Sequence, residues 1–524
     1  MRDLPHTFCL APFTQLTTHP SGSFSPCPYL GGTTWQDASG DIESIWNSSQ
    51  LNDLRQEFLA GGRPQVCNRC WNEENIGKQS LRLRLYNYDV FSDKESLAAT
   101  VASVQDQSYL QGPKILSIKN GNVCNAKCRT CHPEDSSPWI QDAGKLARSG
   151  QNFYKIGIKE INWSDHQISQ IRNMAPKLTR LELFGGESLF NKKILKLLND
   201  IVDDGNSKNI SLYINTNGSV DLLSKIPRID QFRSIDLGVS IDGVAEHFGY
   251  IRHPLNYDQV IANVQRWQKY FVEHNIPHNI QSISTVNILN IFYLPELKQA
   301  IRENLGNSPF WNLLVEPVQL CISNLPWGIK EKVIERIGHD PEFQDLVKFM
   351  KENSNNPAEW VNFLSLRNEL DQIRGENFDK IFPEFADIIN QYLPKTIVYL
   401  GDLSQPWQGQ YLASRAFADS LSSKMLAQSD NEMVAIVNPN GGSEEKSVDQ
   451  LPFGVYYTGY TKWQNPQLLL RLLENADTVY YTPPPHWSDG PDSRNTLMPP
   501  SGWSQIRTEE LIADLENVVV LPPT

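Results

Sequence analysis

The chain has 524 residues, of which 40% are hydrophobic and 10% aromatic, and its formal net charge at pH 7 is −13. This length exceeds what one hydrophobic core can organise, so we expect about three domains. The acidic balance argues against sequence-independent nucleic-acid binding, which needs clustered Lys and Arg. No apolar run reaches the ~18–20 residues that span a bilayer, and the first residues lack the apolar segment of a secretory signal. We therefore expect a cytoplasmic protein that binds neither nucleic acid nor a membrane.

Residues 1–95 are rich in Pro, Gly and Ser turns and are expected to be mostly irregular. Their clearest helical stretch, SQLNDLRQEFLAGG, ends in a Gly-Gly pair that favours a helix stop. A short basic stretch, KQSLRLRLYN, contains Lys78, Arg82 and Arg84. It is interpreted as the solvated face of a helix rather than as a docking patch.

Seven of the eight cysteines fall into two groups. In a long chain without a secretory signal, such grouping favours metal or cluster ligation over disulfides. Four thiolates complete either a tetrahedral zinc site or a 4Fe–4S cluster, so both stay open for the first group. Three thiolates leave one iron of such a cluster open for a small molecule, although a lone triplet also arises with zinc or by coincidence. The first group is Cys9, Cys27, Cys67 and Cys70, the second is Cys124, Cys128 and Cys131, and Cys321 stands apart.

From about residue 113, short β-rich runs alternate with amphipathic helical ones. Six such units in succession predict an α/β fold with a parallel sheet, whose ligands bind at the C-terminal ends of the strands. The cysteine triplet directly follows the first strand, KILSIKNG, and the sixth, FWNLLVEPVQLCI, is expected to end near Cys321. A helical connector and a second α/β pattern come next. The expected domains are 1–95, 110–330, 331–392 and 393–524.

The C-terminal domain is expected to be a small α/β domain of unknown role. Its pattern includes a helix, YLASRAFADSLSSKML, and a strand end, YYTPPPHWSDG, that is either a pocket lining or a surface loop. It lacks the spaced glycines of a dinucleotide fingerprint. We hypothesise that this domain recruits the substrate or a carrier.

The spacing C-x3-C-x2-C in a strand-to-helix loop resembles the signature of the radical SAM superfamily. The resemblance implies a partial (β/α)6, TIM-like barrel in which the three cysteines hold a 4Fe–4S cluster and its open iron binds S-adenosylmethionine (SAM). One electron then cleaves SAM to a 5′-deoxyadenosyl radical, which abstracts a hydrogen atom from an unactivated C–H bond. Thr130, where relatives often have an aromatic or apolar residue, removes a packing contact but no ligand.

Polar motifs at successive strand ends add to this resemblance. FGGES ends the second strand, NTNGS the third and SIDG the fourth. Taken singly, each polar residue is more simply a turn former or a helix cap. By resemblance, the Gly-Gly pair lets the backbone approach the ligand closely, Glu187 binds the methionine ammonium and Arg252 pairs with a carboxylate. The implied SAM-binding residues are Gly185, Gly186, Glu187, Asn215, Asn217, Ser240, Asp242, Arg252 and Asn287.

The first cysteine group resembles the opening half of the SPASM/Twitch module, which carries auxiliary iron–sulfur clusters in many radical SAM enzymes. The module usually follows the barrel, whereas here it precedes it. The resemblance implies a second, auxiliary 4Fe–4S cluster that has no open iron and carries electrons or positions the substrate. A structural zinc stays the alternative.

The predicted function is a radical SAM enzyme that acts on a peptide or protein side chain and completes an oxidation or a crosslink with help from the auxiliary cluster. One alternative keeps the chemistry but takes a small molecule such as a sugar, an aminocyclitol or a nucleotide. Another is a non-catalytic metal-binding or electron-transfer protein, which would not cleave SAM. The chemistry implies an external reductant of the flavodoxin or ferredoxin type. Cys321 is interpreted as a small buried hydrophobe or, alternatively, as a hydrogen-atom donor to the substrate radical.

Overall fold

The computed structural model describes residues 4–391, except 22, 31–34, 37–40, 76–78, 89–93 and 149–152, together with short strands between 397 and 520. The chain divides into two compact units. The first unit comprises Met1–Ala143, Tyr154–Val286 and Pro295–Asn312, and the second comprises Gly144–Phe153, Asn287–Leu294 and Leu313–Thr524. The four domain limits expected from the sequence stay a prediction.

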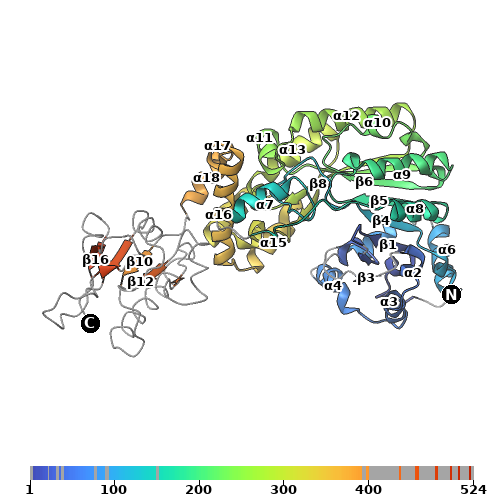
Figure 1. The fold of residues 1–524 in the computed structure, drawn as a ribbon, viewed down its shortest axis with the longest axis horizontal. Coiled ribbons are helices and arrows are strands. Elements are labelled where there is room, and N and C mark those ends of the chain that lie inside the picture. The colour runs from blue at the N-terminus through green and yellow to red at the C-terminus, as the bar shows by residue number, and fades with distance from the viewer. Residues whose placement is uncertain are drawn as a thin grey trace. The chain divides into compact units, whose positions relative to one another are not determined.

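The first unit is built on a nine-stranded sheet with the order β3-β2-β1-β4-β5-β6-β7-β8-β9 (Figure 1). Neighbouring strands from β4 to β8 are parallel and follow one another in the chain, with helices between them. This order confirms the succession of β/α units and the open, partial barrel. The strands are β1 Gln15–Thr18, β2 Ser23–Ser25, β3 Trp35–Gln36, β4 Ile115–Lys119, β5 Arg180–Phe184, β6 Ser211–Thr216, β7 Ser234–Ser240, β8 His278–Val286 and β9 Phe310–Leu313.

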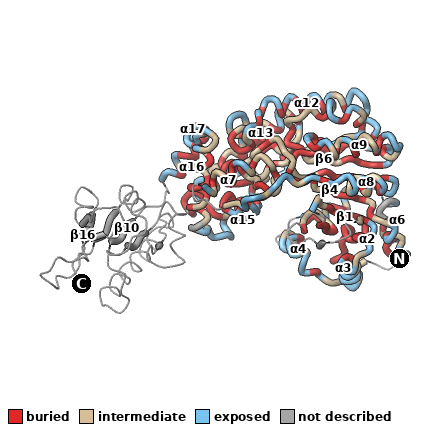
Figure 2. The backbone as a smooth tube through the Cα atoms, in the orientation of Figure 1, coloured by how far each residue is buried: buried red, intermediate tan, exposed pale blue. Residues whose placement is uncertain are grey.

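The strands present two different faces, which fixes where a ligand can bind. In β6, Leu212 and Ile214 are fully buried, whereas the alternating residues Tyr213 and Asn215 keep partial exposure. The pleat sends alternate side chains to opposite faces, so an apolar face packs under the helices and a more polar face lines the barrel. Figure 2 shows buried backbone along the strands and exposed positions on the outer sides of the helices.

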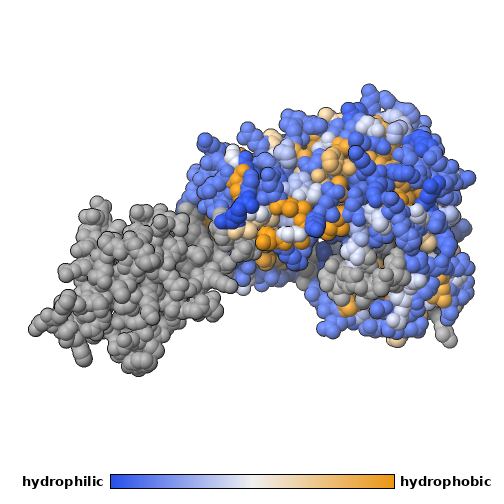
Figure 3. All heavy atoms as spheres, in the orientation of Figure 1, coloured by the Kyte–Doolittle hydropathy of each residue, from blue (hydrophilic) through white to orange (hydrophobic). Residues whose placement is uncertain are grey.

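Helices pack around this sheet, and some of them begin at side-chain caps. Asn191 caps α9 by accepting from the backbone amides of Lys193 and Ile194, and Ser164 forms a capping box with Gln167 at α8. The helices are α1 Ala11–Thr14, α2 Ile42–Trp46, α3 Ser49–Leu59, α4 Asn68–Asn75, α5 Leu81–Arg84, α6 Lys94–Gln105, α7 Trp139–Arg148, α8 Asp165–Met174, α9 Lys192–Asp203, α10 Leu222–Lys225, α11 Ala245–Ile251, α12 Tyr257–Glu273 and α13 Leu294–Leu305. None of the described helices is long and apolar enough to cross a membrane, and the face shown in Figure 3 is mainly hydrophilic over the described residues.

The N-terminal segment is more regular than expected, because it adds β1 to β3 to the barrel sheet. β1 pairs in parallel with β4, from Gln15 opposite Ile115 to Thr18 opposite Ile118. β1 is short, and its polar side chains are buried: the Gln15 amide donates to the Ser117 hydroxyl at 2.8 Å. A strand that buries polar residues on both faces gives no alternating pattern to read.

The basic stretch is not a solvated helix face at Arg82. Arg82 is 7% exposed, and its guanidinium donates to the carboxylate of Glu74, at 2.6 Å from Nη2, and to the carbonyl of Phe8, at 2.9 Å from Nη1. The buried partners lie at distant positions, so the local charge pattern gave the wrong interpretation for this residue. Lys78 lies outside the described residues.

The sixth barrel strand is shorter than predicted, and Cys321 is not near its end. β9 stops at Leu313, and a 3-10 turn, Val318–Leu320, separates it from Cys321. Pro317 interrupts the apolar run between them, and proline cannot donate to a strand ladder. The expected position of Cys321 on the strand is therefore wrong.

The second unit continues with helices packed through aromatic rings. Phe292 stacks on Phe385 with ring centroids 5.2 Å apart, and Phe378 stacks on Phe382 at 4.9 Å. Such aromatic pairs stabilise the packing of these helices. The helices are α14 Trp327–Ile337, α15 Gln344–Glu352, α16 Pro357–Arg374, α17 Phe378–Ile381 and α18 Pro383–Asn390.

Beyond residue 396 the described parts are strands. Five of them form a parallel sheet with the order β11-β12-β10-β13-β16, as expected for a small α/β domain, and β14 pairs with β15. β12 was not predicted from the sequence. The expected helix YLASRAFADSLSSKML and the strand end PPPHWSDG lie outside the described residues. The strands are β10 Ile397–Leu400, β11 Ile436–Val437, β12 Val455–Thr458, β13 Thr478–Tyr481, β14 Thr496–Leu497, β15 Ile506–Arg507 and β16 Val518–Val520.

Candidate functional site

The cysteine triplet lies in the loop between β4 and α7, at the C-terminal end of β4. The buried Asn122 holds this loop: its side-chain amide donates to Pro133 O at 3.0 Å, and its side-chain oxygen accepts from the Ile161 N–H at 2.7 Å. The Trp139 indole N–H donates to Cys128 O at 2.7 Å. The loop is thus fixed by hydrogen bonds to the neighbouring 159–161 segment and to Trp139 at the start of α7 rather than by its own regular structure.

The thiols of this loop are partly buried and close to one another. Burial raises the pKa of Cys124 to about 12, and the neighbouring Cys128 adds to the effect. Burial also raises the pKa of Cys131 well above its ordinary value, with Asp135 and the other two thiols adding to it. Because metal ligation uses the thiolate, binding of a cluster here would release the protons of these thiols.

The Gly-Gly-Glu motif is fastened to the cysteine loop. A Cβ on Gly186 (φ +51°) would lie 2.3 Å from Val123 O, and the Glu187 N–H donates to the same carbonyl at 2.8 Å. The sequence suggested that these glycines allow a close approach to the ligand. The close approach present in the structure is to Val123, which directly precedes Cys124.

Glu187 is buried, and its carboxylate accepts several hydrogen bonds. It accepts from the Asn217 N–H at 2.7 Å, the Thr216 hydroxyl at 2.8 Å and the Leu189 N–H at 3.1 Å. Burial raises the pKa of Glu187, and these hydrogen bonds oppose the rise. The charge of Glu187 also acts on Cys124, so the carboxylate lies within electrostatic reach of the cysteine loop.

Polar side chains at the ends of β6 and β7 form a connected group. Asn217 accepts from the Ser219 hydroxyl at 2.7 Å and donates to the side chain of Asn125 at 2.8 Å, while Ser240 donates to Asn215 at 3.4 Å. Asn125 and Ser219 were not predicted. The sequence feature that could have identified them is their position, Asn125 directly after Cys124 and Ser219 at the end of NTNGS.

Arg252 and Asp242 are buried together beside the cysteine loop. Arg252 Nη2 lies 2.8 Å from Asp242 Oδ2, and Asp242 Oδ1 accepts from the Thr285 N–H at 2.7 Å. Arg252 Nη1 donates to Cys128 Sγ at 3.8 Å. Its Nε is buried and has no partner among the described residues. An unpartnered buried donor next to three thiols fits an anionic ligand group such as a carboxylate.

Two predicted residues, Asn287 and Cys321, belong to the second unit. Asn287 is fully buried, and its side-chain oxygen accepts from the Leu289 N–H at 2.9 Å, which is a turn-forming role. Cys321 is 7% exposed, and burial raises its pKa to about 11. Their proposed roles toward SAM and the substrate stay predictions.

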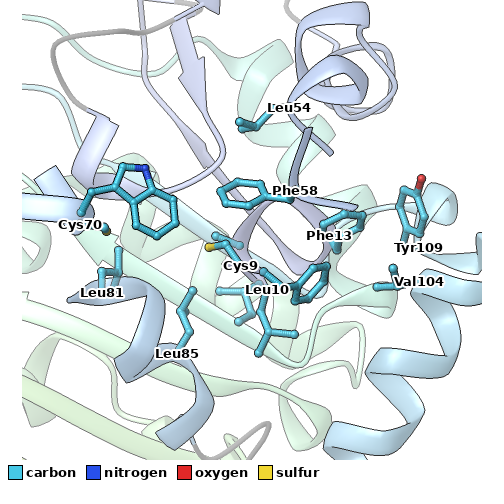
Figure 4. Packing of buried hydrophobic residues seen from close by; sticks show 14 residues of the cluster. Cys9, Leu10, Phe13, Leu54, Phe58, Cys70, Leu81, Leu85, Val104 and Tyr109 are labelled. Atoms are coloured by element: carbon cyan, nitrogen blue, oxygen red, sulfur yellow. The ribbon is translucent and has the colours of Figure 1, made fainter. Parts of the chain in front are cut away.

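The first cysteine group lines one cavity in the first unit. It holds about 390 Å³ of space between atoms, including the solvent at its mouth. Burial raises the pKa of Cys27 and Cys67 to about 12, and the charge of neighbouring cysteines in this group adds to the rise. Figure 4 shows Cys9 and Cys70 facing an apolar surround. The lining residues are Cys9, Ala11, Cys27, Tyr29, Leu30, Phe58, Cys67, Arg69, Cys70, Leu81, Arg82 and Leu85.

This cavity suits a group that binds four thiolates and little else. Apart from the cysteines, the lining residues are apolar or basic except for Tyr29, whose hydroxyl accepts a hydrogen bond from Arg84, so the thiolates are the available metal ligands. A 4Fe–4S cluster is larger than one ion and takes one thiolate on each iron.

One family model matches the chain. Residues 9–71 match SPASM, the iron–sulfur cluster-binding domain, and this range contains the whole first cysteine group. The sequence-based expectation of a SPASM-like module is confirmed. No curated protein matches the chain in sequence.

Solved structures give a weaker likeness. A structure of native anSMEcpe with bound AdoMet is 16% identical, with 48% of this chain and 65% of that chain covered and a TM-score of 0.31. Streptococcus suis SuiB bound to the precursor peptide SuiA is 14% identical, with 61% and 64% covered and a TM-score of 0.29. The chain spans less than two thirds of the length of these proteins, and TM-scores near 0.3 are too low to establish a common fold. By the family match, the protein contains a SPASM iron–sulfur cluster-binding domain, and β1 of this segment pairs with β4 of a partial barrel whose sequence motifs resemble those of the radical SAM superfamily.

Proposed function

We propose that this protein is a radical SAM enzyme that modifies a peptide or protein side chain. One observation carries the proposal: three thiols at the C-terminal end of β4 lie beside the Gly-Gly-Glu motif and beside Arg252. Parallel α/β sheets bind their ligands at this end. A purely electron-carrying protein has no use for the polar residues around the triplet, so the non-catalytic alternative explains less.

Different residues around the triplet would bind the cluster and the different parts of SAM. When bound, the 4Fe–4S cluster and SAM supply a 5′-deoxyadenosyl radical. Cys124, Cys128 and Cys131 would hold the cluster. The unpartnered Nε of Arg252 would face the SAM carboxylate, and Asn215 and Ser240 at the strand ends would orient the nucleoside.

The SPASM domain supports an oxidative outcome. After hydrogen abstraction, the substrate radical must lose an electron if the product is an oxidised or crosslinked side chain. A cluster with all four irons ligated by Cys9, Cys27, Cys67 and Cys70 could accept that electron without binding SAM. A flavodoxin- or ferredoxin-type protein would supply the electron for SAM cleavage.

Peptide or protein substrates are favoured because SPASM/Twitch relatives frequently modify ribosomally made peptides. A sugar, aminocyclitol or nucleotide substrate stays the alternative. The two separate in a coupling assay, in which the correct substrate raises 5′-deoxyadenosine formation above the slow background and gains or loses mass. A rise with small molecules of these classes and none with peptides would reverse the preference.

The chemistry is tested by anaerobic reconstitution followed by iron, sulfide and zinc analysis and by assay of SAM cleavage. Wild type is expected to bind about eight irons, and the triple variant of Cys124, Cys128 and Cys131 to Ala about four. The triple variant should not form 5′-deoxyadenosine, whereas the quadruple Ala variant of the first group should still form it. Zinc without iron in wild type, or an intact cluster without SAM cleavage, would refute the proposal. About four irons and one zinc would make the SPASM domain structural.

A further inference from the structure

The segment around Arg252 lies along the cysteine loop and brackets Cys128. The Lys127 N–H donates to His253 O at 2.7 Å, and the Arg129 N–H donates to Ile251 O, also at 2.7 Å. These two bonds fix the backbone on either side of Cys128 against the backbone on either side of Arg252. The two side chains are therefore held opposite each other by the main chain.

Arg252 uses this position to approach sulfur. Its Nη1 donates to Cys128 Sγ at 3.8 Å, and the side chain is almost completely buried. Asp242 holds the other arm of the guanidinium at 2.8 Å and is itself held by the Thr285 N–H. The donor thus points at the thiol in a fixed orientation, in a place with little water to screen its charge.

We infer that Arg252 sets the reduction potential of the barrel cluster through its hydrogen bond to Cys128, in addition to any contact with SAM. The inference rests on the proposed function, because it requires a 4Fe–4S cluster on the triplet. One-electron reduction adds negative charge to the cluster and its sulfurs. A cationic N–H donor stabilises that charge, so hydrogen bonds to sulfur raise the potential. No proton moves in this step, and the external reductant supplies the electron.

The test measures the potential itself, without substrate or SAM. Arg252→Met, Arg252→Lys and wild type are reconstituted, checked for iron content, and reduced stepwise while the cluster signal is followed by EPR. We expect Arg252→Met to lower the potential by about 59 mV, a tenfold change in the reduction equilibrium, and Arg252→Lys to lower it less. Arg172→Met removes the same charge from an exposed ion pair with Asp204 and is the control, with an unchanged potential expected.

The possible results distinguish failure of this inference from failure of the proposed function. Unchanged potentials in both Arg252 variants, with the cluster intact, overturn this inference and leave the proposed function standing. A residue that only binds the SAM carboxylate would give this result, because SAM is absent. No iron on the triplet of wild type would end the proposed function instead. If Arg252→Met fails to assemble its cluster, Arg252→Lys still carries the test.

Discussion

The contact between the Gly-Gly-Glu motif and the cysteine loop predicts that Gly186→Ala disables the barrel site. The new Cβ would lie 2.3 Å from Val123 O, whereas real Cβ contacts are essentially never under 3.0 Å, so the two must separate by 3.0 − 2.3 = 0.7 Å. The residue also has φ +51°, which adds about 1–2 kcal/mol for a side chain with a Cβ. Val123 directly precedes Cys124, so relieving the contact displaces a cluster ligand. Displacements of this size at a reacting centre lower rates by roughly 10- to 100-fold.

The assay compares iron content, SAM cleavage and the melting temperature of Gly186→Ala with those of Gly205→Ala. Gly205 has φ +73°, but a Cβ added there would meet nothing within 4 Å. Both variants therefore carry backbone strain, and only one carries the collision. We expect Gly205→Ala to lose some stability and keep its iron and its SAM cleavage. If Gly186→Ala matches Gly205→Ala in iron content and cleavage rate, the Gly-Gly pair does not position the cysteine loop.

Three further predictions follow from buried groups. Arg82→Met removes a buried guanidinium from a carboxylate and two carbonyls. We expect the free energy of unfolding, measured in urea, to fall by about 2 kcal/mol and the SPASM domain to lose its iron. The control Arg172→Met removes an exposed arginine and should change neither the free energy of unfolding nor the iron content. Asn122→Ala leaves the buried carbonyl of Pro133 and the partly buried N–H of Ile161 without their partner. We expect the unfolding free energy to fall by about 1–3 kcal/mol and the iron content of the barrel triplet to fall as well. Wild-type iron content in this variant would contradict the role of Asn122. In the metal-free protein, burial raises the pKa of Cys27 and Cys67 from 9.0 to about 12. The contribution of these two thiols to stability is complete below about pH 9 and is lost as the pH rises toward 12. The loss is about 1.4 kcal/mol per thiol and per pH unit. A melting temperature that stays constant from pH 8 to 11 would contradict this burial.

The barrel strands and the triplet were predictable because each carries a local signal. β4 to β8 are continuous β-rich runs whose ends coincide with FGGES, NTNGS and SIDG. The cysteine spacing is also local. Such features survive in the sequence because residues near in the chain define them.

The errors come from residues whose partners are distant. Arg82 looked solvated because its neighbours in the chain are basic, but it is buried against Phe8 and Glu74. Asn122 carries no motif, and its role appears only when Pro133 and Ile161 are brought to it. A helix or strand is predicted from the regular spacing of its hydrophobic residues. Buried polar residues interrupt that spacing, and their hydrogen-bond partners are distant in the chain, so the sequence does not reveal that they are buried.

The two cysteine groups lie at opposite ends of neighbouring strands, which bears on electron transfer. Cys9 precedes the N-terminal end of β1, and Cys27 follows β2, which runs antiparallel to β1, so both belong to the same end of the strand pair. Cys124 follows the opposite, C-terminal end of β4, the parallel neighbour of β1. Ile115 and Lys119 are four residue steps apart along β4, so this strand alone puts about 13 Å between its two ends. A cluster in the SPASM domain would therefore sit too far from the triplet to share a ligand with it or to bind the same SAM. The pairing of β1 with β4 nevertheless joins both groups through one continuous piece of sheet. This arrangement fits the proposed function, in which the electron acceptor is separate from the site of SAM cleavage, and it keeps a module placed before the barrel on the same sheet as the triplet.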